Sequence, residues 1–206
     1  MQGGQQLSWM PQTGVGLAAL SALFAVMTGL PLATNQFAID GAGLTLELLS
    51  PATEQDLLTG KTIANGVTAC APAALCMLGA LALFPGGSPA LWLAVPIGLV
   101  GVLLLLAPAL ALGSILFPRV VNLNSVGSGS NAHFLAGLIG LVGTALAALP
   151  PLLLAFLATG WLNRPTLAPL FLAGWCLVAY AAHLLLFRLL RPLLARRREN
   201  LSLVAG

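Results

Sequence analysis

"LWLAVPIGLVGVLLLLAPALALGSILF", from Leu91 to Phe117, contains no charged residue and only one hydroxyl side chain. An α-helix rises about 1.5 Å per residue, so this stretch is longer than the roughly 30 Å of hydrocarbon in a bilayer. It therefore predicts a membrane-spanning helix.

The rest of the chain repeats this composition. Of its 206 residues, 59% are hydrophobic and only 6% are charged, whereas soluble domains carry about 25% charged residues. Apolar runs of spanning length recur around the first one and predict four further spans, at about 15–33, 63–84, 134–159 and 167–187. We expect an all-α fold, a polytopic transmembrane helix bundle of five spans, in which residues 1–206 form a single transmembrane domain.

The distribution of Lys and Arg between the loops predicts how the bundle lies in the membrane. One set of loops and tail holds Lys61, Arg119, Arg188, Arg191 and Arg196 to Arg198, and the other set holds only Arg164. Positive loops stay on the cytoplasmic side, so the tail 188–206 is predicted to be cytoplasmic. The chain is then a multi-pass protein of the cell membrane (plasma or inner membrane), and its N-terminus is predicted to lie on the outer side. The net charge of +3 is then explained by basic residues that face the anionic surface of the membrane, and it does not indicate a nucleic-acid partner.

"ELLSPATEQDLLTGKTIANG", residues 47–66, is the least typical part of the chain because charged residues gather there: Glu47, Glu54, Asp56 and Lys61. It also contains Gly60-Lys61-Thr62, which matches the last three residues of the phosphate-binding loop motif. Such a loop requires a further glycine five residues before Gly60, where this chain has Gln55. The nucleotide-site interpretation therefore fails.

Residues 35–61 instead predict an amphipathic segment at the cytoplasmic membrane surface. Ser50-Pro51 has the form of a helix start, with a capping hydroxyl before a proline at the first helical position. The turn residues at 40–43 predict two short elements before it. A linker that merely connects two spans is the simpler alternative, but a connection of this length between neighbouring helices favours a function.

The stretch 35–66 also resembles the cytoplasmic connection of ABC-2 type transporter permeases. The resemblance lies at Asn35, Phe37, Asp40, Gly41, Leu48, Leu49, Ser50, Pro51, Leu57, Leu58, Gly60 and Lys61. In that family this connection holds the coupling helix, which docks into a groove on the ATP-binding subunit. The resemblance implies that partner contacts are made by Ser50, Pro51, Glu54, Asp56, Leu57 and Lys61.

The resemblance further implies a membrane-spanning permease subunit, or a fragment of one, in an ATP-driven exporter. The chain would bind no cofactor and would not itself be an enzyme, because ATP and Mg belong to a separate ATP-binding cassette subunit. A second permease copy or homologue would be the other partner. The family's first span has no counterpart here, so a truncated or split permease is expected. The alternative is a non-transporting membrane scaffold or a degenerate accessory subunit.

Within the fourth predicted span, small residues recur every four positions, at Ala136, Gly140, Thr144 and Ala148. Such a strip lets two membrane helices approach closely. Pro150-Pro151 is expected to interrupt this span, because neither residue can donate a backbone hydrogen bond. Residues 152–162 would then continue as a kinked span or fold back as a short external segment.

Ionisable groups are rare inside the predicted spans. No acidic residue lies there, which disfavours proton- or sodium-coupled transport. The two histidines, His133 and His183, are far apart in sequence, and the three cysteines form no CxxC motif, so no metal site or hydrolytic site is predicted. His183 is the histidine within a span. No substrate-binding residue can be named from the sequence.

Overall fold

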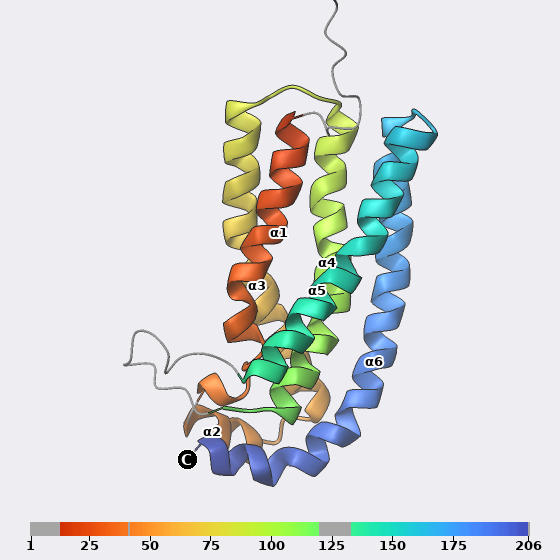
Figure 1. Cartoon of the computed structure of the whole chain (residues 1–206). Coiled ribbons are helices and arrows are strands. Elements are labelled where there is room, and N and C mark those ends of the chain that lie inside the picture. Colours follow the sequence, from red (N-terminus) through yellow and green to blue (C-terminus); the bar gives the residue numbers. More distant parts are fainter. Residues whose placement is uncertain (1–12, 41, 120–132, 206) are drawn as a thin grey trace, which may run out of the picture.

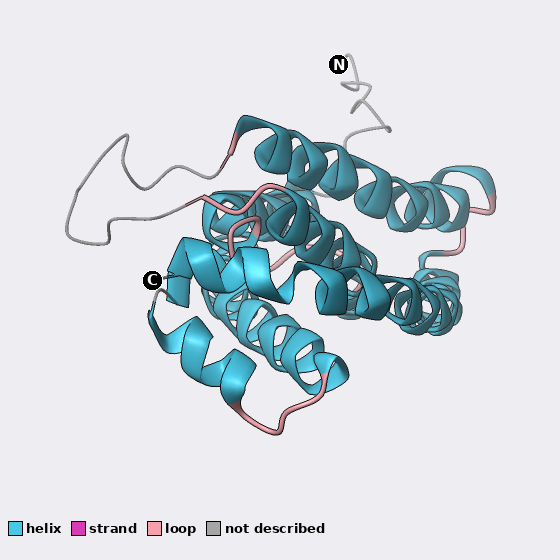
Figure 2. Ribbon diagram, turned by 90° about the horizontal axis from the view of Figure 1, so that it is seen from below, coloured by secondary structure: helices cyan, strands magenta, loops and turns pink. Residues whose placement is uncertain are grey.

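The computed structural model describes residues 13–40, 42–119 and 133–205, and within these ranges the chain forms helices, turns and loops but no strand (Figure 2). Five of the helices are long and apolar enough to cross a membrane. They are α1 (Thr13–Ala33), α3 (Glu54–Leu83), α4 (Pro89–Leu116), α5 (Phe134–Phe156) and α6 (Ala168–Ala205). The predicted all-α bundle of five spans is confirmed, and the chain is a multi-pass membrane protein.

Four short elements complete the described chain. They are η1 (Ala38–Asp40), α2 (Ala42–Leu49), the single π-helical turn η3 (Leu157–Trp161) and η4 (Pro165–Leu167). The first two lie between α1 and α3, as the two short elements expected there. Residues 120–132, which contain the Ser/Gly tract, and the first twelve residues lie outside the described ranges.

The five long helices are not equally embedded in the bundle. Helix α4 is central and packs against α6 and α5 on one side and against α1 on the other, whereas α3 packs on α1 and barely touches α4 (Figure 1). Large apolar side chains remain exposed on the outer faces, among them Leu20, Leu75 and Leu177. This is the arrangement expected when hydrocarbon, and not water, surrounds the helices.

The spans extend beyond the predicted bounds in two places. Helix α3 begins at Glu54 and runs without a break into the apolar stretch that was predicted to begin at residue 63, so the charged segment and the second span share one helix. Helix α6 continues as a helix through the predicted tail. Its last part, which contains Pro192, turns from the bundle axis and crosses beneath the bundle beside α2 (Figure 1).

The expected interruption at Pro150-Pro151 is wrong, because α5 passes through both prolines and continues to Phe156 before the π-helical turn. In that turn the Leu162 N–H donates to the Leu157 carbonyl at 2.9 Å. A bilayer offers no water to an opened backbone, so a helix that keeps its remaining hydrogen bonds is favoured over a break. Residues 152–161 therefore extend the span and do not fold back.

Candidate functional site

The charged residues predicted between the first two spans gather at the end of the bundle that carries α2 and the end of α6. Lys61, on the second turn of α3, forms ion pairs with Asp40 and with Glu47, the latter at 3.3 Å. The Lys61 side chain is only 14% exposed. These pairs tie the start of α3 to η1 and α2 at this end of the bundle.

A third ion pair ties the same region to α6. The Glu54 carboxylate lies 3.6 Å from an Arg198 guanidinium nitrogen, and another nitrogen of Arg198 donates to the Ala52 carbonyl at 3.4 Å. Arg198 thus holds both sides of the bend at residues 50–56, which we call the charged corner.

Helix α3 starts with a capping box, and this corrects the predicted helix start at Ser50-Pro51. The Thr53 hydroxyl oxygen accepts from the Asp56 N–H at 3.2 Å, and the Asp56 carboxylate accepts from the Thr53 N–H at 3.0 Å. Ser50 instead closes α2, since its hydroxyl donates to the Glu47 carbonyl at 2.6 Å.

Both groups with shifted pKa values here precede the apolar, membrane-spanning part of α3, which begins at Ile63. The hydrogen bonds from Thr53 stabilise the charged carboxylate and hold the pKa of Asp56 below its ordinary value. Partial burial lowers the pKa of Lys61, which is the direction expected when an ammonium group leaves water.

Replacing Thr53 with alanine should remove the cap and lower the free energy of unfolding by about 1 kcal/mol. Thr59→Ala, an exposed position in the next turn of the same helix, serves as the control and should change it little. Both can be measured by titrating the purified protein with dodecyl sulfate in mixed micelles. An equal effect of the two substitutions would contradict the assignment of Thr53 as the cap.

Beneath the charged corner lies a hydrophobic cluster that joins four elements. Leu57 and Leu58 of α3 pack there with Phe37, Leu44 of α2, Ile115 of α4 and Leu194 of α6. Leu57 is 8% exposed and Leu58 is 1% exposed. The corner therefore sits on a packed base that it shares with α4 and α6.

The six residues predicted to contact a partner are therefore placed differently from one another. Pro51 and Asp56 are exposed at the corner, and Ser50 and Glu54 are half-buried. Lys61 is largely covered and paired, and Leu57 belongs to the hydrophobic base. Gln55 and Thr59, which the sequence did not single out, are exposed beside Asp56.

A buried polar turn after α1 was missed by the sequence reasoning. The Asn35 side chain forms two hydrogen bonds with the backbone of Arg119: its amide donates to the carbonyl at 2.8 Å and its oxygen accepts from the N–H at 3.1 Å. The Phe37 N–H donates to the Ser114 hydroxyl at 3.1 Å. The sequence did contain a signal for this turn, since Asn35 and Gln36 directly follow an apolar run. Amide side chains that are buried at such a place require hydrogen-bond partners.

The strip of small residues on α5 is buried along its whole length, where α5 meets α4 and α1. Ala136, Thr144 and Ala148 are at most 6% exposed, and Gly140 is buried too. A Cβ atom on Gly140 would lie 2.6 Å from the Thr34 Cγ2 atom and 3.5 Å from a Leu110 methyl group. The glycine thus permits a closer approach than any other residue would allow.

His183 on α6 is buried, and its Nδ1 lies 2.9 Å from the Leu104 carbonyl oxygen of α4. In a regular helix that carbonyl would accept from the N–H of residue 108, but residue 108 is proline. His183 therefore supplies the hydrogen bond that Pro108 cannot. The second histidine, His133, caps α5, since its Nδ1 accepts from the Leu135 N–H at 3.2 Å.

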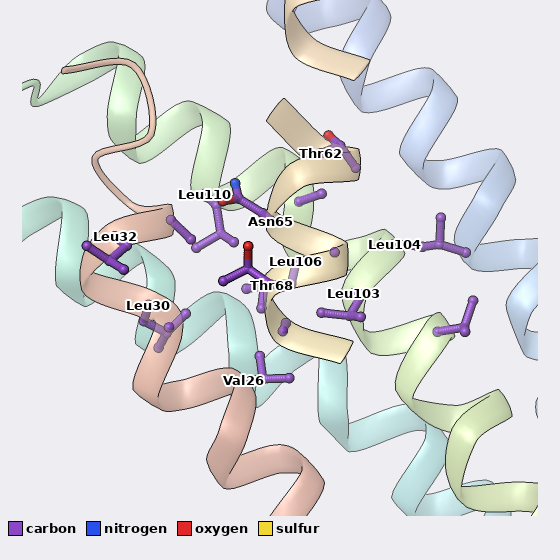
Figure 3. A pocket seen from close by; sticks show the side chains of 16 residues that line it. Val26, Leu30, Leu32, Thr62, Asn65, Thr68, Leu103, Leu104, Leu106 and Leu110 are labelled. Carbon is purple, nitrogen blue, oxygen red and sulfur yellow. The ribbon is translucent and has the colours of Figure 1, made fainter. Parts of the chain in front are cut away.

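A cavity of about 200 Å³ lies between α1, α3 and α4 (Figure 3). No group of three or more His, Cys, Asp or Glu side chains that could hold a metal ion occurs among the residues that the structure describes. The described part of the chain thus offers two candidate sites, the charged corner and this cavity.

Comparison with models of known protein families, with curated proteins and with solved structures gives no match to this chain. The function must therefore be inferred from its own residues.

Proposed function

We propose that the chain is a membrane-spanning permease subunit of an ATP-driven exporter of the ABC-2 type, driven by a separate ATP-binding subunit that docks at the charged corner. One observation carries the proposal. An exposed corner is fixed by ion pairs and by a packed base to spans on both sides of the bundle. Rigid elements and packed side chains of this kind are what transmits force between distant sites.

The path from the corner into the membrane is short. Pro51, Gln55 and Asp56 form the exposed surface, and Asp56 lies within the first turn of α3, which continues through the apolar stretch to Leu83. A push on the corner would tilt α3 as one rod. Because α3 packs on α1 and barely touches α4, the tilt would carry the α1–α3 pair relative to the α4–α6 pair.

The acidic residues of the corner are already used within the chain, and this determines how the proposal is tested. Glu54 pairs with Arg198, and Asp56 belongs to the capping box. Reversing their charge would disturb the fold itself. Gln55 and Thr59 are exposed, and no described contact depends on their side chains, so a change there tests docking alone.

The double variant Gln55→Arg/Thr59→Arg should abolish co-purification of a candidate ATP-binding subunit that the unaltered chain retains, when the two are co-expressed and extracted in detergent. Two arginines would project from the docking surface, and an unmatched charge at an interface core is strongly unfavourable. The control is Gly86→Arg/Thr166→Arg, which adds two arginines at exposed positions at the opposite end of the bundle.

If the unaltered chain retains the ATPase and only the corner variant loses it, the exporter proposal stands. If the chain is folded in the membrane and retains no ATPase, the alternative of a non-transporting scaffold or degenerate accessory subunit replaces it. Equal loss in the two double variants would also reject the corner as the docking surface.

A further inference from the structure

The cavity between α1, α3 and α4 exists because α3 packs on α1 while barely touching α4. It is bounded by Leu30 of α1, by Asn65 and Ala69 of α3, and by Leu103 and Leu106 of α4 (Figure 3). An apolar cavity of roughly 150 Å³ already takes up small apolar molecules in place of water. The volume of about 200 Å³ here is large enough for such a guest.

Each polar side chain of the lining already forms a hydrogen bond within the chain. Thr62, Asn65 and Thr68 are the polar residues among the lining side chains. The Thr62 and Thr68 hydroxyls each donate to a carbonyl of their own helix at 2.8 Å, and the Asn65 amide donates to Gln36. No charged residue lines the cavity. The ligand that fits this lining is therefore an uncharged, flexible and apolar molecule.

The position of the cavity indicates where that guest comes from. Its lining on α3 runs from Thr62 to Ala69, and at about 1.5 Å per residue it therefore lies within roughly 12 Å of Lys61 along the helix. Two lining residues, Leu32 and Val100, are half exposed on the outer surface, at 49% and 48%. The cavity thus opens sideways into the hydrocarbon, within about two helical turns of the charged end of the bundle.

We propose that this cavity binds part of one acyl chain of a membrane phospholipid, drawn from the leaflet on the side of α2. The inserted chain supplies the dispersion contacts that α3 and α4 do not make with each other. The headgroup stays outside at the level of the charged corner. This inference does not rest on the exporter proposal, since a scaffold with the same helices would bind the same lipid.

Three glycine substitutions test the proposal, because a Cβ atom added at each position meets no atom within 4 Å. Gly29→Leu and Gly66→Leu add bulk at two lining positions, one on α1 and one on α3. Gly79→Leu adds the same bulk on the exposed surface of α3, away from the cavity. The three variants share the gain in helix propensity, so they differ only in whether the cavity is filled.

Each protein is reconstituted in vesicles of phosphatidylglycerol and phosphatidylethanolamine, re-extracted, washed extensively in detergent, and assayed for phospholipid retained per chain by native mass spectrometry. The unaltered chain and Gly79→Leu should each retain one phospholipid that Gly29→Leu and Gly66→Leu lose. Retention by both cavity variants, loss in Gly79→Leu, or no retained lipid in the unaltered chain would each overturn the proposal.

Discussion

Gly140→Leu should lower the free energy of unfolding by about 3 kcal/mol, the upper part of the range for overpacking a well-packed core. Even a Cβ atom at this position would lie 2.6 Å from the Thr34 Cγ2 atom. Thr34 cannot move aside, because it is fully buried and its hydroxyl donates to the Leu30 carbonyl at 2.8 Å. The clash therefore separates α5 from α1.

The matched control for this prediction is Gly137→Leu, three residues earlier on α5, where an added Cβ meets no atom within 4 Å. Both substitutions raise helix propensity by the same amount, and only one of them enters the helix contact. Dodecyl sulfate titration of the two purified variants measures the difference. Equal stability of the two would show that the strip does not set the separation of the helices.

His183→Leu should lower the free energy of unfolding by about 1–3 kcal/mol, the cost of leaving a buried carbonyl without its hydrogen bond. Leucine keeps the apolar contact with Phe187, whose ring lies 4.2 Å from that of His183, but it cannot reach the Leu104 carbonyl as a partner. In hydrocarbon no water replaces the lost bond.

A double-mutant cycle makes this prediction specific. Pro108→Ala restores the N–H that the Leu104 carbonyl lacks, so His183→Leu should cost little in that background. Pro96→Ala, on the same helix but away from His183, should leave the cost unchanged. The coupling energy between positions 108 and 183 measures the bond itself. The same cost in both proline backgrounds would reject it.

The spans could be predicted from the sequence because the required length of apolar chain is set by the bilayer and not by neighbouring elements. The strip on α5 was visible for the same local reason, a period of four residues in one helix. The start of α3 was not, since both Ser50-Pro51 and Thr53 satisfy the local rules for a cap. Only the end of α2, which uses the Ser50 hydroxyl, distinguishes them.

The contacts that define the two candidate sites depend on residues far apart in sequence, and local patterns do not pair them. Nothing near Glu54 indicates that its partner is Arg198, and nothing near Lys61 indicates that it is covered by Asp40 and Glu47. The cavity is a consequence of which helices fail to meet, which no single helix reveals. The continuity of α5 through Pro150-Pro151 is not a local property either, because it depends on the absence of water around the helix.

The hydrogen bond between His183 and Leu104 also imposes an order on biosynthesis. Its two residues are 79 positions apart, and at roughly 5–20 residues per second the ribosome needs roughly 4–16 s to make the second after the first. During that interval the Leu104 carbonyl of α4 lies in the membrane without its hydrogen bond from His183. The third span thus gains the partner of this carbonyl only when the last span has entered the bilayer beside it.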